Sequence, residues 1–340
     1  IRMGLTPISL RAETGPIGGN LSHEFQILAK TGESTLYYDK KLETLNPETI
    51  DPNELQSFYA AVDDQHEEKN CPISNEDSLA LLKEAKEMGV RLFDSAPIYG
   101  FGLSERRMGE AFKKMREEVF LCSKSGVTWS SSKRVDMTND PQVTQRMLEQ
   151  TLRDFQSDYV DLYMIHWPDP RVDIRRPMEV LAKAKEQTKI RHIGLCNTTP
   201  EDLLKAQEIE EIEVVQSQFN LFEDSLKKDF LPELKKQGIS FMSWGTLDKG
   251  ILTGRVHEKR QYDRCDARSW APWWNKKLNA KKVKALEAVW PYLKEQGHTG
   301  LELSLGYNLS HEEMSSVICG MRNPQQLHMT IKALQNLPGP

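Results

Sequence analysis

The chain has 340 residues, of which 38% are hydrophobic and 28% are charged, and its formal net charge is −5. This composition is typical of a folded globular protein and excludes disordered and fibrous chains. Its apolar runs are shorter than the roughly 18 residues that a membrane-spanning helix needs, so we expect no membrane partner. The first residues also lack the apolar stretch of a secretory signal, and we therefore expect a cytoplasmic protein.

Charge is divided unevenly along the chain. Residues 1–73 hold six Lys and Arg against twelve Asp and Glu, which leaves 39 basic and 38 acidic residues in the remainder. The acidic balance of this segment argues against a nucleic-acid partner. The cysteines lack the CxxC spacing of metal and redox sites, so we expect free thiols and no metal site. They are Cys71, Cys122, Cys196, Cys265 and Cys319.

Regular patterning begins at Ser74. Ser74 and Asp77 resemble a capping box, apolar residues recur at helical spacing as far as Ala85, and Gly89 is a stop signal, so a helix is predicted here. Beyond it, apolar segments alternate with amphipathic ones, which predicts parallel βα units. The expected strands are VRLFDSA (90–96), VFLCSK (119–124), DLYMIHW (161–167), IRHIGLCN (190–197), VVQSQFN (214–220), SFMSWG (240–245) and SVICG (316–320). Amphipathic helices are expected within 143–155, 176–187, 225–237 and 280–296.

Seven strands and eight helices are one strand short of a (β/α)8 TIM barrel, and the missing strand is the first. We therefore expect an α/β fold in which residues 74–340 form this barrel and residues 1–73 form a small α+β segment. HEFQILAK (23–30) and STLYYD (34–39) look strand-like, but the link from Lys30 to Ser74 is far longer than the usual 2 to 6 residues. The segment should therefore form a separate hairpin outside the barrel and leave a partly open or loosely closed barrel of seven strands.

Four polar residues follow or end predicted strands, at the face where barrels of this type build active sites. They are Asp94, Tyr99, Lys124 and His166. A buried Lys ammonium beside a Tyr hydroxyl would lower the pKa of the phenol, while Asp94 would keep Lys124 charged. A neutral His166 could hold a substrate oxygen, and Tyr99 could then supply a proton to it.

Six stretches of the chain resemble, in order, those of the aldo-keto reductases. They are FDSAPIYGFGLSE, VDLYMIHWPDP, KIRHIGLCN, VVQSQFNL, SWGTLDKGILTGR and VICGMRNPQQL. The resemblance covers residues 76–337 and implies reduction of an aldehyde or ketone by hydride transfer from NADPH rather than NADH. It also implies that Asp94, Tyr99, Lys124 and His166 are a catalytic tetrad with Tyr99 as the general acid.

The same resemblance implies a set of cofactor-binding residues. Asn197 and Gln216 match the pair that binds the nicotinamide carboxamide, and Trp244 matches the aromatic residue that stacks on its ring. The pyrophosphate and adenosine positions are Thr246, Leu247, Gly250, Arg255, Gly320, Arg322 and Gln326, and Thr330 stands where the family usually has Asn. Trp129, Trp167 and the SWAPWW cluster (269–274) either line the substrate pocket or pack the top of the barrel.

Residues 1–73 resemble a different family. MGLTPISLRAETGPIGGNLSHEFQILAKTGEST and FYAAVDDQHEEKNCPI are similar to part of the catalytic domain of bacterial prolyl-tRNA synthetase. The ATP-binding signatures of that enzyme are absent, so the resemblance implies a fragment without aminoacylation activity, in which His23 and Glu24 are strand residues. Either a gene fusion or an error in the gene model would produce such a join.

Three functions are compatible with these patterns. The first is an NADPH-dependent reductase of small carbonyl compounds. The second is a regulatory barrel that binds the cofactor without turnover. The third is a synthetase-derived module, which the acidic charge and the missing signatures disfavour.

Overall fold

The computed structural model describes residues 7–12, 22–27, 73–257, 260–262, 266–269, 271 and 274–338. The chain divides into two compact units, Ile1–Cys71 and Pro72–Pro340. In the first unit, strands β1 (Pro7–Ala12) and β2 (Ser22–Ile27) form an antiparallel two-stranded sheet with Pro7 opposite Ile27. A strand within HEFQILAK is thus confirmed, although its partner β1 was not predicted, and STLYYD lies outside the described residues.

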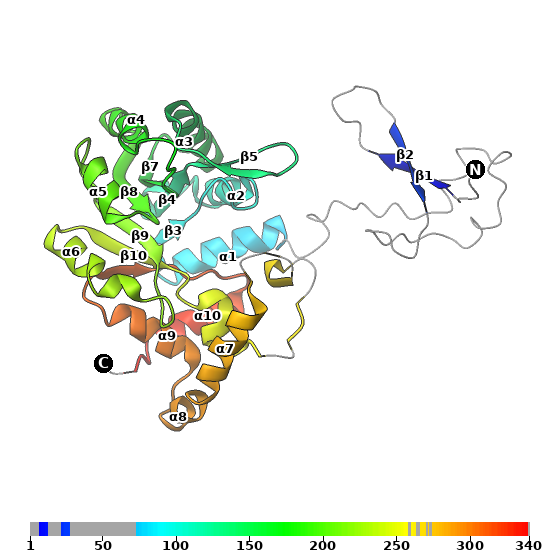
Figure 1. Ribbon diagram of the computed structural model, residues 1–340, viewed down its shortest axis with the longest axis vertical. Helices are drawn as coiled ribbons and strands as arrows, with labels where there is room; N and C mark the ends of the chain where they lie inside the picture. Colours follow the sequence, from blue (N-terminus) through cyan, green and yellow to red (C-terminus); the bar gives the residue numbers. More distant parts are fainter. Residues whose placement is uncertain are drawn as a thin grey trace. The chain divides into compact units, whose positions relative to one another are not determined.

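The second unit is built on a curled sheet of seven parallel strands (Figure 1). Consecutive strands are neighbours, because a helix after each strand returns the chain to the start of the next. The strands are β3 (Leu92–Asp94), β4 (Phe120–Ser125), β7 (Val160–Ile165), β8 (Ile190–Cys196), β9 (Val214–Gln218), β10 (Ser240–Trp244) and β11 (Met314–Val317). All seven predicted strands are therefore confirmed. A short antiparallel pair, β5 (Val127–Trp129) and β6 (Val135–Met137), follows β4.

Ten α-helices are described around this sheet. They are α1 (Asn75–Glu87), α2 (Leu103–Phe112), α3 (Pro141–Phe155), α4 (Arg175–Glu186), α5 (Pro200–Gln207), α6 (Phe230–Lys236), α7 (Lys276–Glu287), α8 (Trp290–Glu295), α9 (Gly300–Leu309) and α10 (Pro324–Ala333). As predicted, Ser74 caps α1 by accepting a hydrogen bond of 3.0 Å from the backbone N–H of Asp77. The segment 280–296 was expected as one helix but forms parts of two, because Pro291 is compatible only with the first turn of α8.

The strand order leaves both ends of the sheet unpaired within the described part of the chain. β3 pairs with β4 only, β11 pairs with β10 only, and β2 pairs with β1 in a separate sheet. The interior strand β7 is buried at every residue, whereas most of β11 is only partly buried. The expectation of a seven-stranded, open barrel is thus confirmed.

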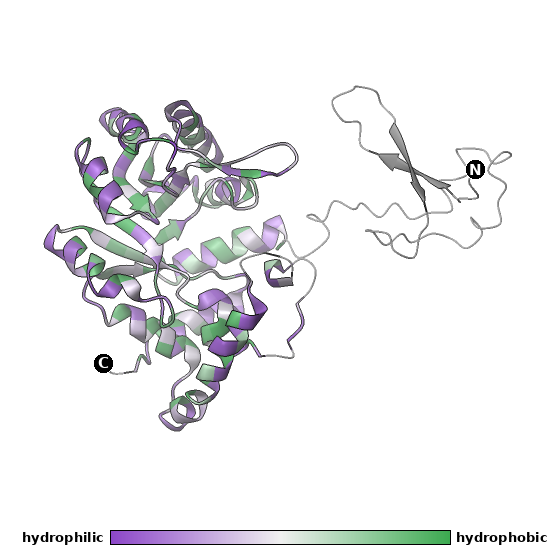
Figure 2. Cartoon of the chain, viewed as in Figure 1, coloured by the Kyte–Doolittle hydropathy of each residue, from purple (hydrophilic) through white to green (hydrophobic). Residues whose placement is uncertain are grey.

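Two apolar layers hold the elements together. The larger core lies between the sheet and the helices and includes Phe112, Leu148 and Phe241. A smaller cluster of Cys122, Leu162, Met164, Cys196 and Met242 contains residues from four strands of the sheet. Figure 2 shows hydrophilic residues along the outer faces of the surrounding helices and mostly hydrophobic residues along the strands.

Candidate active site

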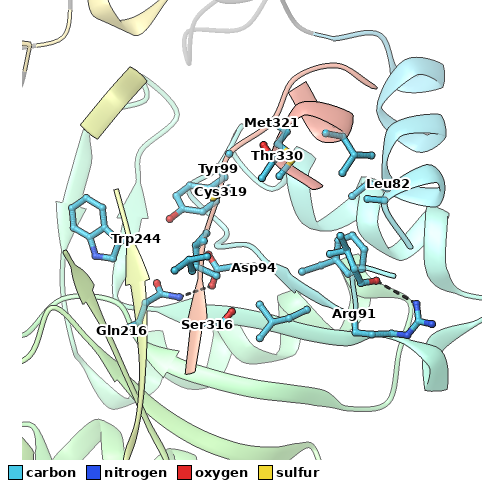
Figure 3. Close-up of a pocket in the computed structure, with 18 of the residues that line it drawn as sticks. Leu82, Arg91, Asp94, Tyr99, Gln216, Trp244, Ser316, Cys319, Met321 and Thr330 are labelled. Carbon is cyan, nitrogen blue, oxygen red and sulfur yellow. Dashed lines mark hydrogen bonds between the residues drawn. The ribbon is translucent and has the colours of Figure 1, made fainter. Parts of the chain in front are cut away.

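The predicted catalytic side chains lie at the carboxyl ends of adjacent strands. Asp94 is the last residue of β3, Lys124 is near the end of β4, and His166 follows β7, while Tyr99 lies in the loop between β3 and α2. Asp94, Tyr99 and His166 line a cavity of about 780 Å³ (Figure 3). Lys124 is completely buried beside Asp94. The fold therefore brings all four residues together.

An ion pair between Lys124 and Asp94 forms the base of this group. Nζ of Lys124 lies 2.7 Å from Oδ2 of Asp94 and donates a second hydrogen bond of 2.8 Å to the backbone oxygen of Ser95. Burial is the largest single effect and lowers the pKa of Lys124, but the Asp94 carboxylate, together with Tyr99 and Cys196, raises it by more, and the net pKa lies above its ordinary value. Lys124 therefore remains charged at neutral pH.

Tyr99 lies beside this ammonium, with Nζ of Lys124 5.4 Å from the centroid of its ring. We expected Lys124 to lower the pKa of Tyr99 from its ordinary value, and the net direction of that prediction is wrong. Although 42% of Tyr99 is exposed, desolvation of its phenol oxygen raises the pKa, and the opposing effect of Lys124 is smaller. Asp94 also raises this pKa, because a nearby carboxylate disfavours a phenolate. Tyr99 therefore keeps its proton at neutral pH.

His166 lies on the other side of Tyr99. The two ring centroids are 6.0 Å apart in an edge-on arrangement, and the backbone N–H of His166 donates to the backbone oxygen of Ser125. Burial, and then the charge of Lys124, lower the pKa of His166 to about 3. The imidazole is therefore neutral at neutral pH, as the sequence argument expected, and one ring nitrogen carries a proton to donate.

The three residues expected at the nicotinamide come from neighbouring strands and line the same cavity. Nε1 of Trp244 donates to Oδ1 of Asn197 over 2.9 Å, and Nδ2 of Asn197 donates to the backbone oxygen of His166 over 3.0 Å. Nε2 of Gln216 donates to Oδ1 of Asp94 over 2.9 Å (Figure 3). These amides therefore link the cavity wall to the ion pair.

A second cavity, of about 640 Å³, shares Trp244 and residues 318–321 with the first. It is lined by the seven residues expected at the pyrophosphate and adenosine, namely Thr246, Leu247, Gly250, Arg255, Gly320, Arg322 and Gln326. Gly250 has a φ of +95°, which a residue with a side chain rarely adopts. Oε1 of Gln326 accepts a hydrogen bond of 2.7 Å from the backbone N–H of Arg322.

Three further basic residues, Lys249, Arg260 and Arg268, line this second cavity, and the sequence argument missed them. The density of arginines between residues 255 and 268 was a signal that could have pointed to them. Arg268 is held by Asp266, with Nε 2.8 Å from Oδ1. The cavity thus presents several cations, which fits a ligand with phosphate groups.

The turn that follows β10 and lines the second cavity is anchored by another ion pair. Nζ of Lys282 on α7 lies 2.8 Å from Oδ2 of Asp248, whose side chain is 1% exposed. Oγ1 of Thr246 donates to the backbone oxygen of Ile318 over 3.2 Å. These contacts fix the turn that contains Thr246, Leu247 and Gly250, and neither Asp248 nor Lys282 was anticipated from the sequence.

The sequence left open whether the tryptophans line the substrate pocket or pack the top of the barrel, and the described tryptophans differ in this respect. Trp167 lines the first cavity, stacked on His166 with ring centroids 6.5 Å apart. Trp129 packs edge-on against Phe101, with centroids 5.4 Å apart. In the SWAPWW cluster, Trp274 packs against Tyr262, whereas Trp270 and Trp273 lie outside the described residues.

No described helix combines the length and apolar character required to cross a bilayer. No group of three or more His, Cys, Asp or Glu side chains in the described ranges is arranged to hold a metal ion.

The curled parallel sheet and its surrounding helices define a barrel-type α/β fold, and comparison with known proteins gives its family. The model of the aldo/keto reductase family matches residues 64–338, and the chain belongs to this family. It is 30% identical over 265 residues to the aldo-keto reductase YhdN of Bacillus subtilis, covering 77% of this chain and 78% of that protein.

The names of two other relatives state different cofactors. The NADH-specific methylglyoxal reductase of Escherichia coli is 27% identical, covering 74% of this chain and 81% of the relative. The aldo-keto reductase yakc [NADP(+)] of Schizosaccharomyces pombe is 26% identical, covering 78% of this chain and 79% of the relative. The structure of a glycerol dehydrogenase from Gluconobacter oxydans superimposes with a TM-score of 0.68 at 26% identity, covering 78% of this chain and 80% of that one.

The N-terminal resemblance is confirmed by a separate set of relatives. Over 75 residues, which are 22% of this chain, the sequence is 65% identical to the proline–tRNA ligase of Wolbachia sp. subsp. Drosophila simulans. This match covers only 18% of the ligase.

Proposed function

We propose that this protein reduces an aldehyde or ketone with NADPH and that Tyr99 is the proton donor. The observation that carries the proposal is the protonated Tyr99 beside the Lys124–Asp94 ion pair and the neutral His166 at one cavity wall. The bound nicotinamide would supply a hydride to the carbonyl carbon. His166 would hold the carbonyl oxygen, and Tyr99 would transfer its hydroxyl proton to that oxygen, which yields the alcohol.

The second cavity supports the cofactor assignment. Asn197 and Gln216 would bind the carboxamide and Trp244 would stack on the ring, while the Thr246–Gly250 turn and Arg255 would hold the pyrophosphate. Arg322 supports NADPH over NADH, because a guanidinium pairs well with a phosphate dianion. Gln326 and the backbone at Gly320 would contact the adenosine.

The proposed reductase comprises residues 74–340. Residues 1–73 cover a small part of a ligase, and we propose that they carry no aminoacylation activity. The described cysteines Cys122, Cys196 and Cys319 are free thiols, which supports a cytoplasmic location.

A Tyr99→Phe variant tests the central step. NADPH oxidation should fall by at least about a hundredfold with small aldehydes, because the transition state loses its proton donor. The Kd for NADPH, measured by quenching of protein fluorescence, should change less than about threefold, since the hydroxyl belongs to the catalytic step.

The matched control is Tyr292→Phe, which removes the same hydroxyl from a side chain that is 64% exposed. This control should retain full turnover. If Tyr99→Phe kept turnover within a few-fold of the parent, another group would be the acid. NADPH binding by the parent without turnover of any aldehyde or ketone would indicate a cofactor-binding barrel instead.

A further inference from the structure

The first cavity is much longer than a small carbonyl group requires. From Asp94, Tyr99 and His166 it continues past the open edges of β3 and β11 to helices α1 and α10. Figure 3 shows Leu82 of α1 and Thr330 of α10 on the far side of the cavity from Trp244. The cavity therefore connects the proposed catalytic group with the position of the missing strand.

The walls of this extension are mainly apolar, and we call it the strand-gap channel. It is lined by Leu82, Ala85, Leu92, Val317, Leu327 and Ile331. Arg91, Ser316 and Thr330 are the polar residues of the same region. Oγ1 of Thr330 donates to the backbone oxygen of Gln326, and Nη1 of Arg91 donates to that of Lys86, both over 2.9 Å. The strand-gap channel thus offers a ligand mainly hydrophobic contacts.

Helices α1 and α10 cover the outer side of the channel. Nε2 of His328 on α10 lies 2.5 Å from Oε1 of Glu84 on α1, which ties the two helices together across the gap. The opposite end of the channel opens beside Tyr99, whose loop follows β3, and β3 forms one wall of the gap. A substrate oxygen at Tyr99 would therefore lie at the mouth of the strand-gap channel.

From this continuity we infer that the preferred substrates are aldehydes with a long unbranched aliphatic chain. The inference rests on the proposed function, because the aldehyde group must lie at Tyr99 and His166. The chain of such a substrate enters the strand-gap channel and buries its methylene groups against α1, α10 and the two open strands. A charged tail is disfavoured by the mainly apolar walls.

The dependence of kcat/KM on chain length tests this inference in the full-length protein with NADPH. From propanal to decanal, kcat/KM should rise by about two- to fourfold for each added CH2, because each buried methylene contributes roughly 0.8 kcal/mol. The rise should level off once the chain exceeds the channel. A flat or falling profile would overturn the inference while leaving the proposed reductase activity in place.

Two variants that fill the strand-gap channel sharpen the test. Leu82→Trp on α1 and Ile331→Trp on α10 should each lower kcat/KM for decanal by about tenfold or more and change that for propanal less than about threefold. Lys83→Trp is the control, because Lys83 is exposed on the same helix and does not line the cavity. Equal losses for both aldehydes in a well-folded variant, or no loss for decanal, would contradict a chain-binding role.

A binding measurement separates this inference from the reductase proposal. 1-Decanol, the alcohol that reduction of decanal yields, should raise the Tm of the parent and the Lys83→Trp control, but not that of Leu82→Trp or Ile331→Trp. 1-Propanol at the same concentration should have little effect in all four proteins. Binding of decanol without turnover of any aldehyde would support the channel and refute the enzyme, whereas absence of decanol binding would refute the channel.

Discussion

Burial and the charge of Lys124 together determine the protonation of both side chains that would meet a substrate oxygen. Burial is the larger influence on each: it lowers the pKa of His166, as the charge of Lys124 also does, and it raises the pKa of Tyr99, which Lys124 opposes. Asp94, paired with Lys124, adds to the raised pKa of Tyr99, so Tyr99 remains a protonated donor and His166 a neutral one. The sequence was sufficient to identify these four residues, but the direction predicted for the pKa of Tyr99 was wrong. The extent of burial depends on distant chain segments, whose positions the spacing of residues in the sequence does not define.

The basic residues that line the second cavity lead to a prediction about cofactor preference. Arg322→Ala should weaken NADPH binding by about tenfold or more and NADH binding by less than about threefold, because only NADPH carries the 2'-phosphate. Fluorescence titration with both cofactors measures the two Kd values. Lys332→Ala is a suitable control, since Lys332 is exposed on α10 and lines neither cavity. Equal weakening of both cofactors by Arg322→Ala would show that Arg322 supports the loop rather than the phosphate.

A buried carboxyl outside the cavity should make stability depend on pH. Glu105 of α2 is completely buried, and its Oε1 accepts hydrogen bonds from Ser123 and Thr151, the latter of 3.0 Å, while its Oε2 has no partner among the described residues. Burial raises the pKa of Glu105 from 4.5 to about 7, although both hydrogen bonds lower it. The folded state therefore binds this proton more tightly than the unfolded state, and the stabilisation is lost as pH rises through about 7.

Glu105→Gln removes that titration and keeps an oxygen for the two hydroxyl donors. The variant should match the parent near pH 4.5 and exceed its free energy of unfolding by about 2 to 3 kcal/mol above pH 8. Urea unfolding at both pH values measures the difference. A constant difference across this range would mean that Glu105 is ionised, or protonated, throughout.

At the scale of elements, the strands were predictable because hydrophobic runs bounded by polar segments are a local signal. The break between α7 and α8 was less visible, since the apolar periodicity continues through Pro291. The strand β1 was missed because PISLRA is short and is recognisable as a strand only through its pairing with β2. Likewise, Arg268 and Lys282 reach the site through contacts between distant segments, and no local pattern indicates such contacts.

The contact between α2 and α3 depends on a glycine. A Cβ at Gly109 would lie 2.1 Å from the backbone oxygen of Asp154, so the two helices could not remain at their present separation. Gly109→Ala should lower the free energy of unfolding by about 1 to 3 kcal/mol, even though alanine favours helix. Glu110→Ala, at an exposed neighbouring position of α2, should be nearly neutral in the same urea experiment. An unchanged stability in Gly109→Ala would mean that α2 can move away without cost.

For the whole molecule, the main departure from a closed barrel is that the described strands leave the position between β3 and β11 unfilled. In a closed barrel every strand has two neighbours, and no edge exposes unpaired backbone groups. Here the described parts of β3 and β11 each have one neighbour, and the cavity beside the proposed catalytic group extends into the space between them. The two edges thus expose backbone groups that a closed barrel would pair, and the space between them forms the strand-gap channel.

Supplying the missing strand should reverse both effects. We expect that replacing residues 1–73 with the segment that precedes the first helix in the Bacillus subtilis relative raises the Tm by at least about 5 °C, because two edges gain backbone hydrogen bonds and apolar cover. Amide hydrogen exchange should slow along β3 and β11, and the preference for long-chain aldehydes should disappear as the inserted strand fills the channel. A Gly/Ser-rich replacement of equal length is the control and should leave Tm, exchange and chain-length preference unchanged. If both replacements behaved alike, the gap between β3 and β11 would not be a vacant strand position.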